Sequence, residues 1–137
     1  MRSHDTLLLI EDDEVDILTV RRALRELGSN CTLLVAKDGL EALDILRDST
    51  MPRPSLVLLD LNMPRMNGLE MLRAARDEEL LTTTPVVVLT TSAHERDVVE
   101  GFNLAISGYM VKPVDFRKFV EVFRVIDSYW TLSELPV

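Results

Sequence analysis

Several short apolar segments of this sequence end in, or run directly into, a residue that can do chemistry. Asp60 follows the apolar segment SLVLL, and a proline and a glycine come within the next eight residues. The acids of residues 11–13 follow TLLLI, Thr90 ends PVVVLT, and Lys112 follows GYMV. Because a lone carboxylate is costly to bury, an acid directly after so apolar a segment indicates an edge where several functional groups meet.

Together these residue types are suited to phosphoryl chemistry. Neighbouring carboxylates repel one another, and a hard divalent cation relieves that repulsion. A set of oxygen ligands without histidine or cysteine favours Mg²⁺ over zinc. One carboxylate can then act as a nucleophile and form an aspartyl phosphate, while Lys112 and Thr90 neutralise and hydrogen-bond the phosphoryl oxygens. Each feature alone also has an ordinary structural explanation, such as acids that favour a helix start, so the hypothesis depends on their coincidence.

The order of elements predicts that these groups do meet. Nearly continuous apolar segments indicate strands that are covered on both faces. We expect strands at residues 6–10, 31–36, 55–60, 85–90 and 108–111. Patterns of period 3.6 predict helices at residues 14–27, 39–47, 68–77, 95–104 and 115–130. Leu18 and Leu40 are among the residues expected to face the core. Five β–α repeats predict an α/β fold with a parallel sheet, helices on both faces, and ligands at the carboxyl ends of the strands.

Composition limits the other possibilities. The chain has 137 residues and a net charge of −8, which fits one domain and disfavours binding to nucleic acid or to an acidic membrane surface. The single cysteine, Cys31, excludes an intramolecular disulfide and favours a reducing compartment. No apolar segment approaches the roughly 20 residues of a membrane span. We therefore expect a cytoplasmic protein with one domain at residues 1–130 and a C-terminal tail at residues 131–137.

Over residues 5–127 the sequence resembles the response-regulator receiver domains of two-component signalling systems. The similarity lies in LLLIEDDE, LVLLDLNMPRMNG, VVLTTS and GYMVKP. Asp60 matches the phosphoacceptor of that family, Thr90 its hydroxyl residue 30 positions later, and Lys112 its lysine a further 22 positions on. The resemblance implies a flavodoxin-like (βα)5 fold with a five-stranded parallel sheet. It also implies a signalling protein that accepts a phosphoryl group from a histidine kinase, rather than an enzyme that acts on other substrates.

The resemblance assigns a magnesium site to the first and third strand ends. Glu11 and Asp12 are similar to the acidic pair that holds Mg²⁺ in the family, together with Asp60 and the backbone carbonyl of Asn62. The acidic triplet leaves a one-residue ambiguity, so Asp13 is the alternative to Glu11. We favour the first two acids because the preceding apolar residue should complete the strand.

Further roles are implied at the fourth and fifth strand ends. Thr90 and Lys112 would bind the phosphoryl oxygens. Thr90 and Tyr109, which stands three residues before the lysine, match the pair of the family that switches on phosphorylation. Side chains at Asn62 and Ser92 would lie where water attacks the acyl phosphate and would tune its hydrolysis.

The last predicted helix is apolar on two sides. Beyond the stripe that faces the core, Val122, Val125 and Tyr129 fall on a second side, and Trp130 continues it toward the tail. A helix that is apolar on two sides is usually covered on both, so we expect a homodimer, with the tail as a possible interface arm. The segments EDDEVD and SYWTLSELP are also similar to standalone receivers that partner phytochrome-type histidine kinases. We therefore expect output through protein contact, without an attached output domain.

Three other functions fit the sequence less well. A phosphatase of the haloacid dehalogenase type needs a second carboxylate two residues after its nucleophile, where this chain has Asn62. A binding module that does not depend on phosphorylation would not need both Asp60 and Lys112. A flavin or nucleotide carrier would need a phosphate-cradling glycine loop, whereas the first predicted strand–helix turn is acidic and has no glycine.

Overall fold

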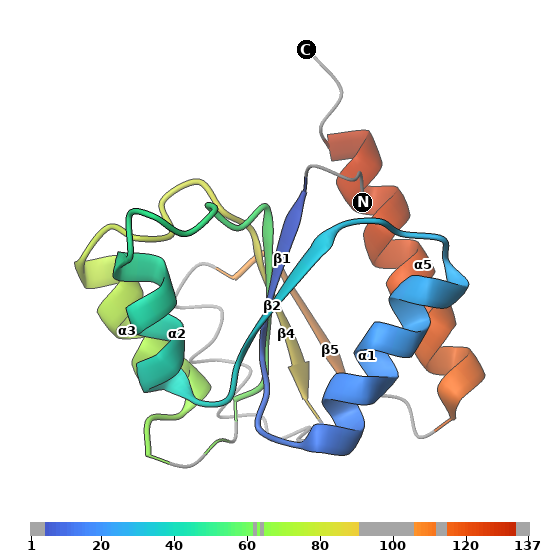
Figure 1. Ribbon diagram of the computed structural model, residues 1–137, viewed down its shortest axis with the longest axis horizontal. Helices are drawn as coiled ribbons and strands as arrows, with labels where there is room; N and C mark the ends of the chain where they lie inside the picture. Colours follow the sequence, from blue (N-terminus) through green and yellow to red (C-terminus); the bar gives the residue numbers. More distant parts are fainter. Residues whose placement is uncertain (1–4, 62, 64, 91–105, 112–114, 134–137) are drawn as a thin grey trace.

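Residues 5–61, 63, 65–90, 106–111 and 115–133 are described by a computed structural model of the chain. Five strands form one parallel sheet in the order β2-β1-β3-β4-β5 (Figure 1). Their bounds are β1 Thr6–Ile10, β2 Thr32–Ala36, β3 Leu56–Leu59, β4 Val86–Thr90 and β5 Gly108–Val111. The predicted α/β fold with a five-stranded parallel sheet is confirmed. The order reverses between β1 and β3, and open sheets of this kind bind ligands at the carboxyl ends of such a pair.

Helices cover both faces of the sheet. Their bounds are α1 Glu14–Glu26, α2 Gly39–Arg47, α3 Gly68–Asp77 and α5 Phe116–Ser133. Figure 1 shows α2 and α3 on one face, and α1 and α5 on the other. The first three helices begin where a side chain accepts hydrogen bonds from the first turn: Asp13, Asp38 and Asn67 are their N-caps. These N-cap residues fix the helix starts at the edge of the sheet where the strands end.

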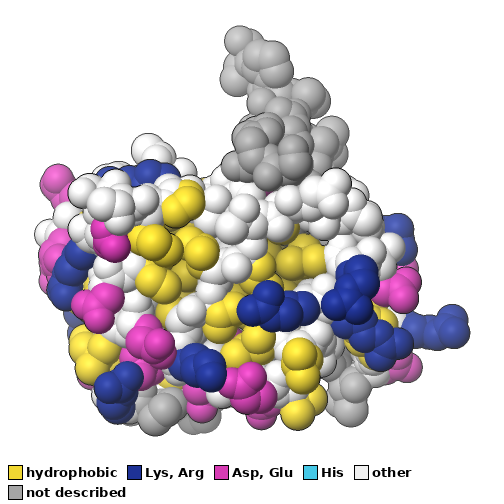
Figure 2. All heavy atoms as spheres, in the orientation of Figure 1, with side chains coloured by type: hydrophobic (Ala, Val, Ile, Leu, Met, Phe, Trp, Pro, Cys, Tyr) yellow, Lys and Arg dark blue, Asp and Glu magenta, His cyan; other side chains and the backbone are white. Residues whose placement is uncertain are grey.

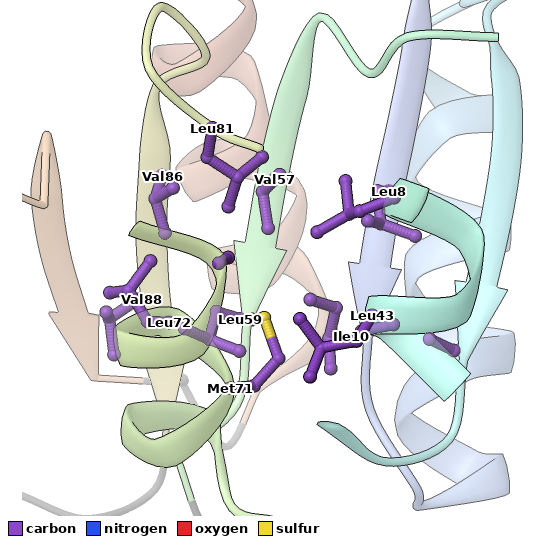
Figure 3. Packing of buried hydrophobic residues seen from close by; sticks show 14 of the residues in the cluster. Leu8, Ile10, Leu43, Val57, Leu59, Met71, Leu72, Leu81, Val86 and Val88 are labelled. Carbon is purple, nitrogen blue, oxygen red and sulfur yellow. The ribbon is translucent and has the colours of Figure 1, made fainter. Parts of the chain in front are cut away.

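The core has two halves because successive strand residues face opposite sides of the sheet. Leu8 and its partner Val57 pack beneath α2 and α3, as Figure 3 shows. Leu7 and Leu58 pack beneath α1 and α5. All four side chains are buried. Burial on both faces explains why the strands have continuous apolar sequences rather than alternating ones.

Two residues expected in the core lie on the surface instead. Leu18 is 63% exposed and Leu40 is 42% exposed. Ile17 and Leu43, which the same patterns also place toward the core, are buried as predicted. In both helices apolar residues border the buried stripe, and a helical period cannot decide which of them faces the sheet.

The predicted bounds of the elements are close to the observed ones. β1, β5, α2 and α3 begin and end at the predicted residues. The expected helix at residues 95–104 lies outside the described residues. α5 continues to Ser133, so the predicted tail at residues 131–137 begins inside this helix, and the boundary at residue 130 falls within it. The predicted helix end at residue 130 therefore lies three residues before the observed end.

Hydrophobic side chains reach the surface along one edge of the sheet. Figure 2 shows them between the two pairs of helices, where β2 forms the edge in Figure 1. Leu33, Leu34 and Val35 of β2 are half-buried. Among the described helices, none has the length and apolar character needed to cross a membrane.

Candidate functional site

Three carboxylates meet at the carboxyl end of the sheet. Glu11, Asp12 and Asp60 each offer one oxygen, and these oxygens all lie within 4.8 Å of one another. Glu11 is 2% exposed and Asp60 is 8% exposed, whereas Asp12 is exposed to solvent. The three residues come from two strand ends that are 49 residues apart in the sequence, and the structure brings them together.

Backbone hydrogen bonds hold the two buried acids. The amide of Asp60 donates to the carbonyl oxygen of Ile10 at 3.0 Å, and the amide of Glu11 donates to Ala36 at 2.9 Å. These bonds continue the pairing of β3 with β1, and of β1 with β2, by one residue past the strand ends. The carboxylates are therefore attached to the ends of two paired interior strands of the sheet.

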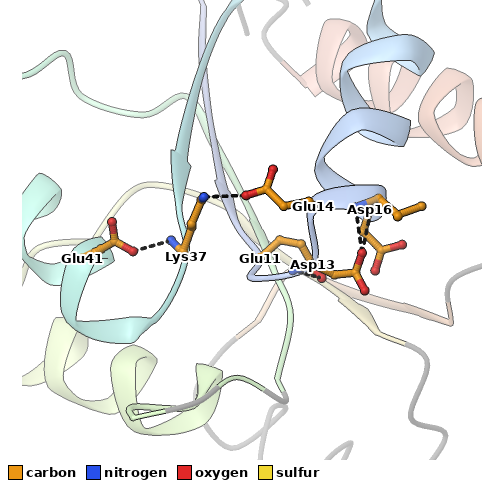
Figure 4. Close-up of polar contacts among 7 residues, drawn as sticks. Glu11, Asp13, Glu14, Asp16, Lys37 and Glu41 are labelled. Carbon is orange, nitrogen blue, oxygen red and sulfur yellow. Dashed lines mark hydrogen bonds and ion pairs between the residues drawn. The ribbon is translucent and has the colours of Figure 1, made fainter.

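Asp13 has a different role from its two neighbours. Its Oδ1 accepts hydrogen bonds from the amides of Val15 at 2.8 Å and Asp16 at 3.1 Å, and it is the N-cap of α1 (Figure 4). Its own amide donates to Oε1 of Glu11 at 3.3 Å. The third acid of the triplet thus starts the helix, and the first two join Asp60.

An exposed ion pair lies at the carboxyl edge of the sheet. Nζ of Lys37 lies 2.5 Å from Oε1 of Glu14, and the Lys37 amide donates to Oε2 of Glu41 at 2.9 Å (Figure 4). The hydrogen bond to Glu14 and its negative charge raise the pKa of Lys37. Both side chains of the ion pair are exposed, so the pair contributes little to stability. It connects the first turn of α1 with the turn between β2 and α2.

A small cavity of about 10 Å³ lies against the acidic cluster. Its lining residues are Leu9, Glu11, Asp16, Val20, Leu59, Asp60, Leu89 and Phe119. The cavity is close to the smallest that holds one water molecule, roughly 10–15 Å³. Charges beside such apolar walls interact more strongly than charges in bulk water. Asp16 is the third acid that lines this cavity, after Glu11 and Asp60. It was not among the predicted site residues, and its position in the first turn after the acidic triplet is the sequence signal that could have found it.

The loop after Asp60 returns closely to it. The amide of Gly68 donates to the carbonyl oxygen of Leu61 at 3.0 Å. A β-carbon at Gly68 would overlap the backbone carbonyl of Asp60 and the α-carbon of Leu61. Glycine is therefore required here by close approach of two backbone segments. Asn67 and Glu70 then start α3 with a capping box, which orients the helix that follows the loop.

Of the other site residues predicted at the strand ends, the structure describes only the backbone of Thr90 and Tyr109. Asn62, Ser92 and Lys112 lie outside the described residues. Thr90 ends β4, where it pairs in register with β5, and Tyr109 of β5 pairs in register with β4. The backbone of both strands therefore reaches the same edge of the sheet as the acidic cluster.

The second apolar side of α5 is less separate from the core than predicted. Val122 is half-buried and packs against the cluster beneath α1 and α5. Val125 is 58% exposed. Tyr129 and Trp130 belong to α5, but their side chains are outside the described part of the chain. Val122 is partly covered by its own fold because it borders the buried stripe, and its place in an interface between copies stays a prediction.

The donor set of the cluster suits a hard divalent cation. Among the described residues, all three groups in the cluster are carboxylates, and neither histidine nor cysteine takes part. Oxygen ligands of this kind match Mg²⁺. Two of the three acids are buried beside apolar walls, where like charges repel more strongly than in bulk water. A cation at this position would relieve that repulsion, so the residues present fit such an ion.

Comparison with known proteins agrees with this geometry. The family model of the response regulator receiver domain matches residues 7–124. The chain is similar to the response regulator Rcp1 of Synechocystis sp. (strain ATCC 27184 / PCC 6803 / Kazusa). The two are 34% identical over 128 residues, which cover 90% of this chain and 87% of Rcp1.

Two solved structures extend the similarity to three dimensions. The phosphorylated cyanobacterial phytochrome response regulator RcpA superposes with a TM-score of 0.89 at 30% identity, covering 96% of this chain and 97% of RcpA. The Mn²⁺-bound form of Rcp1 superposes with a TM-score of 0.85 at 33% identity, covering 97% of this chain and 98% of Rcp1. Both structures therefore share the arrangement of strands and helices over nearly the whole chain.

Proposed function

Because this chain belongs to the response regulator receiver domain family, we propose that it accepts a phosphoryl group on Asp60 and that Mg²⁺ supports the reaction. The observation that carries the proposal is the meeting of Asp60 with Glu11 and Asp12 at the carboxyl end of the sheet. Asp60 is at the position that matches the phosphoacceptor of the family. It is nearly buried, yet the exposed Asp12 beside it marks the side of the site that solvent reaches.

Each acid has a distinct role in this proposal. Glu11 and Asp12 would hold Mg²⁺ together with Asp60 and the backbone carbonyl of Asn62. When bound, Mg²⁺ supplies positive charge that offsets the repulsion between the carboxylates and an incoming phosphoryl group. Glu11 is buried, and the bond from its backbone amide to Ala36 holds it in place beside Asp60. Asp13 is assigned to the helix cap and not to the ion.

Phosphoryl transfer to Asp60 and the later hydrolysis each form one bond to phosphorus and break another. A carboxylate oxygen of Asp60 attacks the phosphorus of a phosphohistidine, a P–O bond forms, the P–N bond breaks, and the histidine nitrogen regains a proton from solvent. In hydrolysis a water oxygen attacks the phosphorus, and the Asp60–phosphorus bond breaks to give phosphate and the free carboxylate. Thr90 and Lys112 would bind the phosphoryl oxygens, Tyr109 would follow Thr90 in the switch, and Asn62 and Ser92 would set the rate of hydrolysis.

The phosphoryl donor in this proposal is a histidine kinase of the phytochrome type. Support comes from a solved relative that is described as a cyanobacterial phytochrome response regulator and covers nearly the whole chain. Another is described as a response regulator in red light signaling of R. palustris, with a TM-score of 0.85. Each alignment covers at least 96% of this chain.

A homodimer through α5 is the second part of the proposal. Val125 exposes a large apolar side chain to solvent on this helix, and Tyr129 and Trp130 follow it by one turn in the sequence. Exposed apolar residues that gather on one helix commonly mark a contact with another protein. A second copy of the chain supplies the same surface, so a two-fold interface satisfies both copies at once.

Phosphorylation by acetyl phosphate tests the main proposal. The wild-type protein and an Asp60→Asn variant would be incubated with Mg²⁺ and acetyl phosphate, and intact-mass spectrometry would count the added phosphoryl groups. One hydroxylamine-labile phosphoryl group on the wild type alone would establish Asp60 as the acceptor. A group on both proteins would contradict it. If neither protein reacts, a purified phytochrome-type kinase replaces acetyl phosphate, and no transfer from that kinase either would overturn the proposal.

A further inference from the structure

The loop that follows Asp60 is attached to the N-terminus of α2 by an ion pair. Nε of Arg65 donates to Oδ2 of Asp38 at 2.7 Å, and Nη2 of the same guanidinium bonds the same oxygen. The Asp38 side chain is only 5% exposed, whereas that of Arg65 is 60% exposed. The pair joins two loops at the edge of the sheet that carries the acidic cluster, although the residues are 27 positions apart in the sequence.

Asp38 is fully engaged by this arrangement. Its Oδ1 accepts from the amide of Glu41 at 2.9 Å and caps α2, while its Oδ2 binds Arg65. The hydrogen bond from the Glu41 amide, reinforced by Arg65, lowers the pKa of Asp38 against the opposing effect of burial. The carboxylate is therefore ionised at neutral pH. One of its oxygens binds the start of α2, and the other binds the loop that carries Arg65.

A second attachment lies directly beside the first. The amide of Gly39 donates to the carbonyl oxygen of Met66 at 3.0 Å, and a β-carbon at Gly39 would overlap Met66. Arg65 itself has a φ of 61°, a left-handed backbone conformation that is uncommon for residues other than glycine. Two adjacent loop residues are thus bound to the N-cap and the first residue of α2, and one of them has a strained backbone conformation.

These attachments determine where the loop lies relative to Asp60. At its other contact the loop is closed on itself by the bond between the Gly68 amide and Leu61. The described residues of the loop, 61, 63 and 65–67, are therefore held at Leu61 beside the acceptor and at Arg65 and Met66 beside the start of α2.

We propose that the Asp38–Arg65 pair is a positioning latch that holds the β3–α3 loop in the arrangement that binds Mg²⁺ next to Asp60. The latch rests on the proposed function, because the loop carries the residue assigned to the ion beside Asp60. Neither residue of the pair belongs to the acidic cluster, so both act through the loop. Loss of the latch should weaken Mg²⁺ binding several-fold, less than the roughly 10- to 100-fold loss expected when a residue bonded to a metal ligand is removed.

Two variants with opposite changes in charge test the latch. Arg65→Gln removes a positive charge, and Asp38→Asn removes a negative charge while an asparagine can still cap α2. If only long-range charge mattered, Arg65→Gln would strengthen Mg²⁺ binding and Asp38→Asn would weaken it. The latch predicts that both variants bind Mg²⁺ more weakly than the wild type. Calorimetric titration of the unphosphorylated proteins measures this without relying on phosphotransfer.

Arg47→Gln is the matched control. Arg47 makes the same kind of ion pair, donating from Nε to Oε1 of Glu78 at 2.8 Å and from Nη2 to Oε2 at 2.5 Å, but it joins α2 to α3. Its loss should leave Mg²⁺ affinity unchanged. Amide hydrogen exchange at Gly39 gives a second reading, since it should accelerate in Arg65→Gln and stay constant in Arg47→Gln.

The possible results separate clearly. Weaker Mg²⁺ binding in both latch variants, with faster exchange at Gly39 and an unaffected Arg47→Gln control, would support the latch. Unchanged or tighter binding in Arg65→Gln would overturn it, as would an equal loss in the control. Faster exchange with unchanged Mg²⁺ affinity would limit the pair to holding the loop and would also overturn its role at the site. A wild-type protein that does not bind Mg²⁺ at all would instead contradict the proposed function.

Discussion

The backbone carbonyl of Asp60 faces the α-carbon of Gly68 so closely that a β-carbon at residue 68 would overlap it. The loop between them leaves the end of β3 and returns to the same point, where α3 begins. Backbone atoms on both sides of this contact have little freedom to move apart, since the Asp60 amide is bonded to Ile10 and the Gly68 amide to Leu61. The contact therefore links the start of α3 to the position of the acceptor.

Gly68→Ala should damage both stability and phosphorylation. The added methyl group meets backbone rather than a flexible side chain, so we expect a loss of about 1–3 kcal/mol in the free energy of unfolding, as in other overpacked sites. The displaced Asp60 should also accept phosphoryl groups from acetyl phosphate more slowly. Urea denaturation and mass spectrometry measure the two effects. Gly28→Ala is the control: Gly28 has a φ of 68° with open space around it, so it should lose roughly 1–2 kcal/mol from backbone strain alone and keep the wild-type rate.

Glu11→Gln and Asp13→Asn should separate the roles of two neighbouring acids. Both substitutions remove one negative charge. Glu11→Gln replaces one carboxylate of the cluster by a neutral amide and should weaken Mg²⁺ binding by roughly 10-fold or more. Asp13→Asn keeps an N-cap of similar quality and should have a much smaller effect. Calorimetric titration with Mg²⁺ provides the comparison, and equal losses in the two variants would return Asp13 to the metal site.

Asp38 should make the stability of the protein depend on pH in the acid range. The pKa of Asp38 in the folded protein lies below its value in the unfolded chain, which is about 3.9. The stabilisation from the ionised carboxylate is therefore complete at neutral pH and is lost as the pH falls through about 4 toward the folded-state pKa. Urea denaturation should show Asp38→Asn less stable than wild type at pH 7, with the difference shrinking below pH 4. A difference that stayed constant with pH would argue against an ionised Asp38.

Val125→Asp should dissociate the proposed dimer. A buried and unpaired carboxylate at an apolar contact is unfavourable, so light scattering should report the mass of a monomer where the wild type gives a dimer. Val15→Asp is a matched substitution at a valine that is 70% exposed on α1 and should leave the mass unchanged. A wild-type protein that is already monomeric, both with and without acetyl phosphate, would count against the interface.

The sequence was sufficient for the layout of the fold but not for every side chain in it. Continuous apolar segments and helical periods located β1, β5, α2 and α3 at their observed bounds. The same periods placed both Ile17 and Leu18 toward the core, whereas the structure buries only Ile17 of the two. Such neighbours differ by 100° around a helix, and only packing against the sheet decides between them.

In the candidate site, too, the sequence predicts which strand ends meet but not every side-chain contact. Strand order is enough to bring Glu11 and Asp60 together, because both follow parallel strands that end at one edge. The separation of Asp13 from the cluster depends on hydrogen bonds to the first turn of α1, which the acidic triplet does not reveal. The pairing of Asp38 with Arg65 joins two loops that are distant in the sequence, and it has no local signal at all.

The acidic cluster is built from two segments that are 49 residues apart in the chain and meet only when β1 and β3 pair. An ion that needs all three carboxylates can therefore bind the native protein but not the unfolded chain. Mass action then couples occupancy to folding, and a free ion at 100 times its dissociation constant adds about 2.7 kcal/mol to the free energy of unfolding. The thermal midpoint of this protein should rise with Mg²⁺ concentration. A series of melting curves at increasing Mg²⁺ concentration therefore measures the affinity of the site.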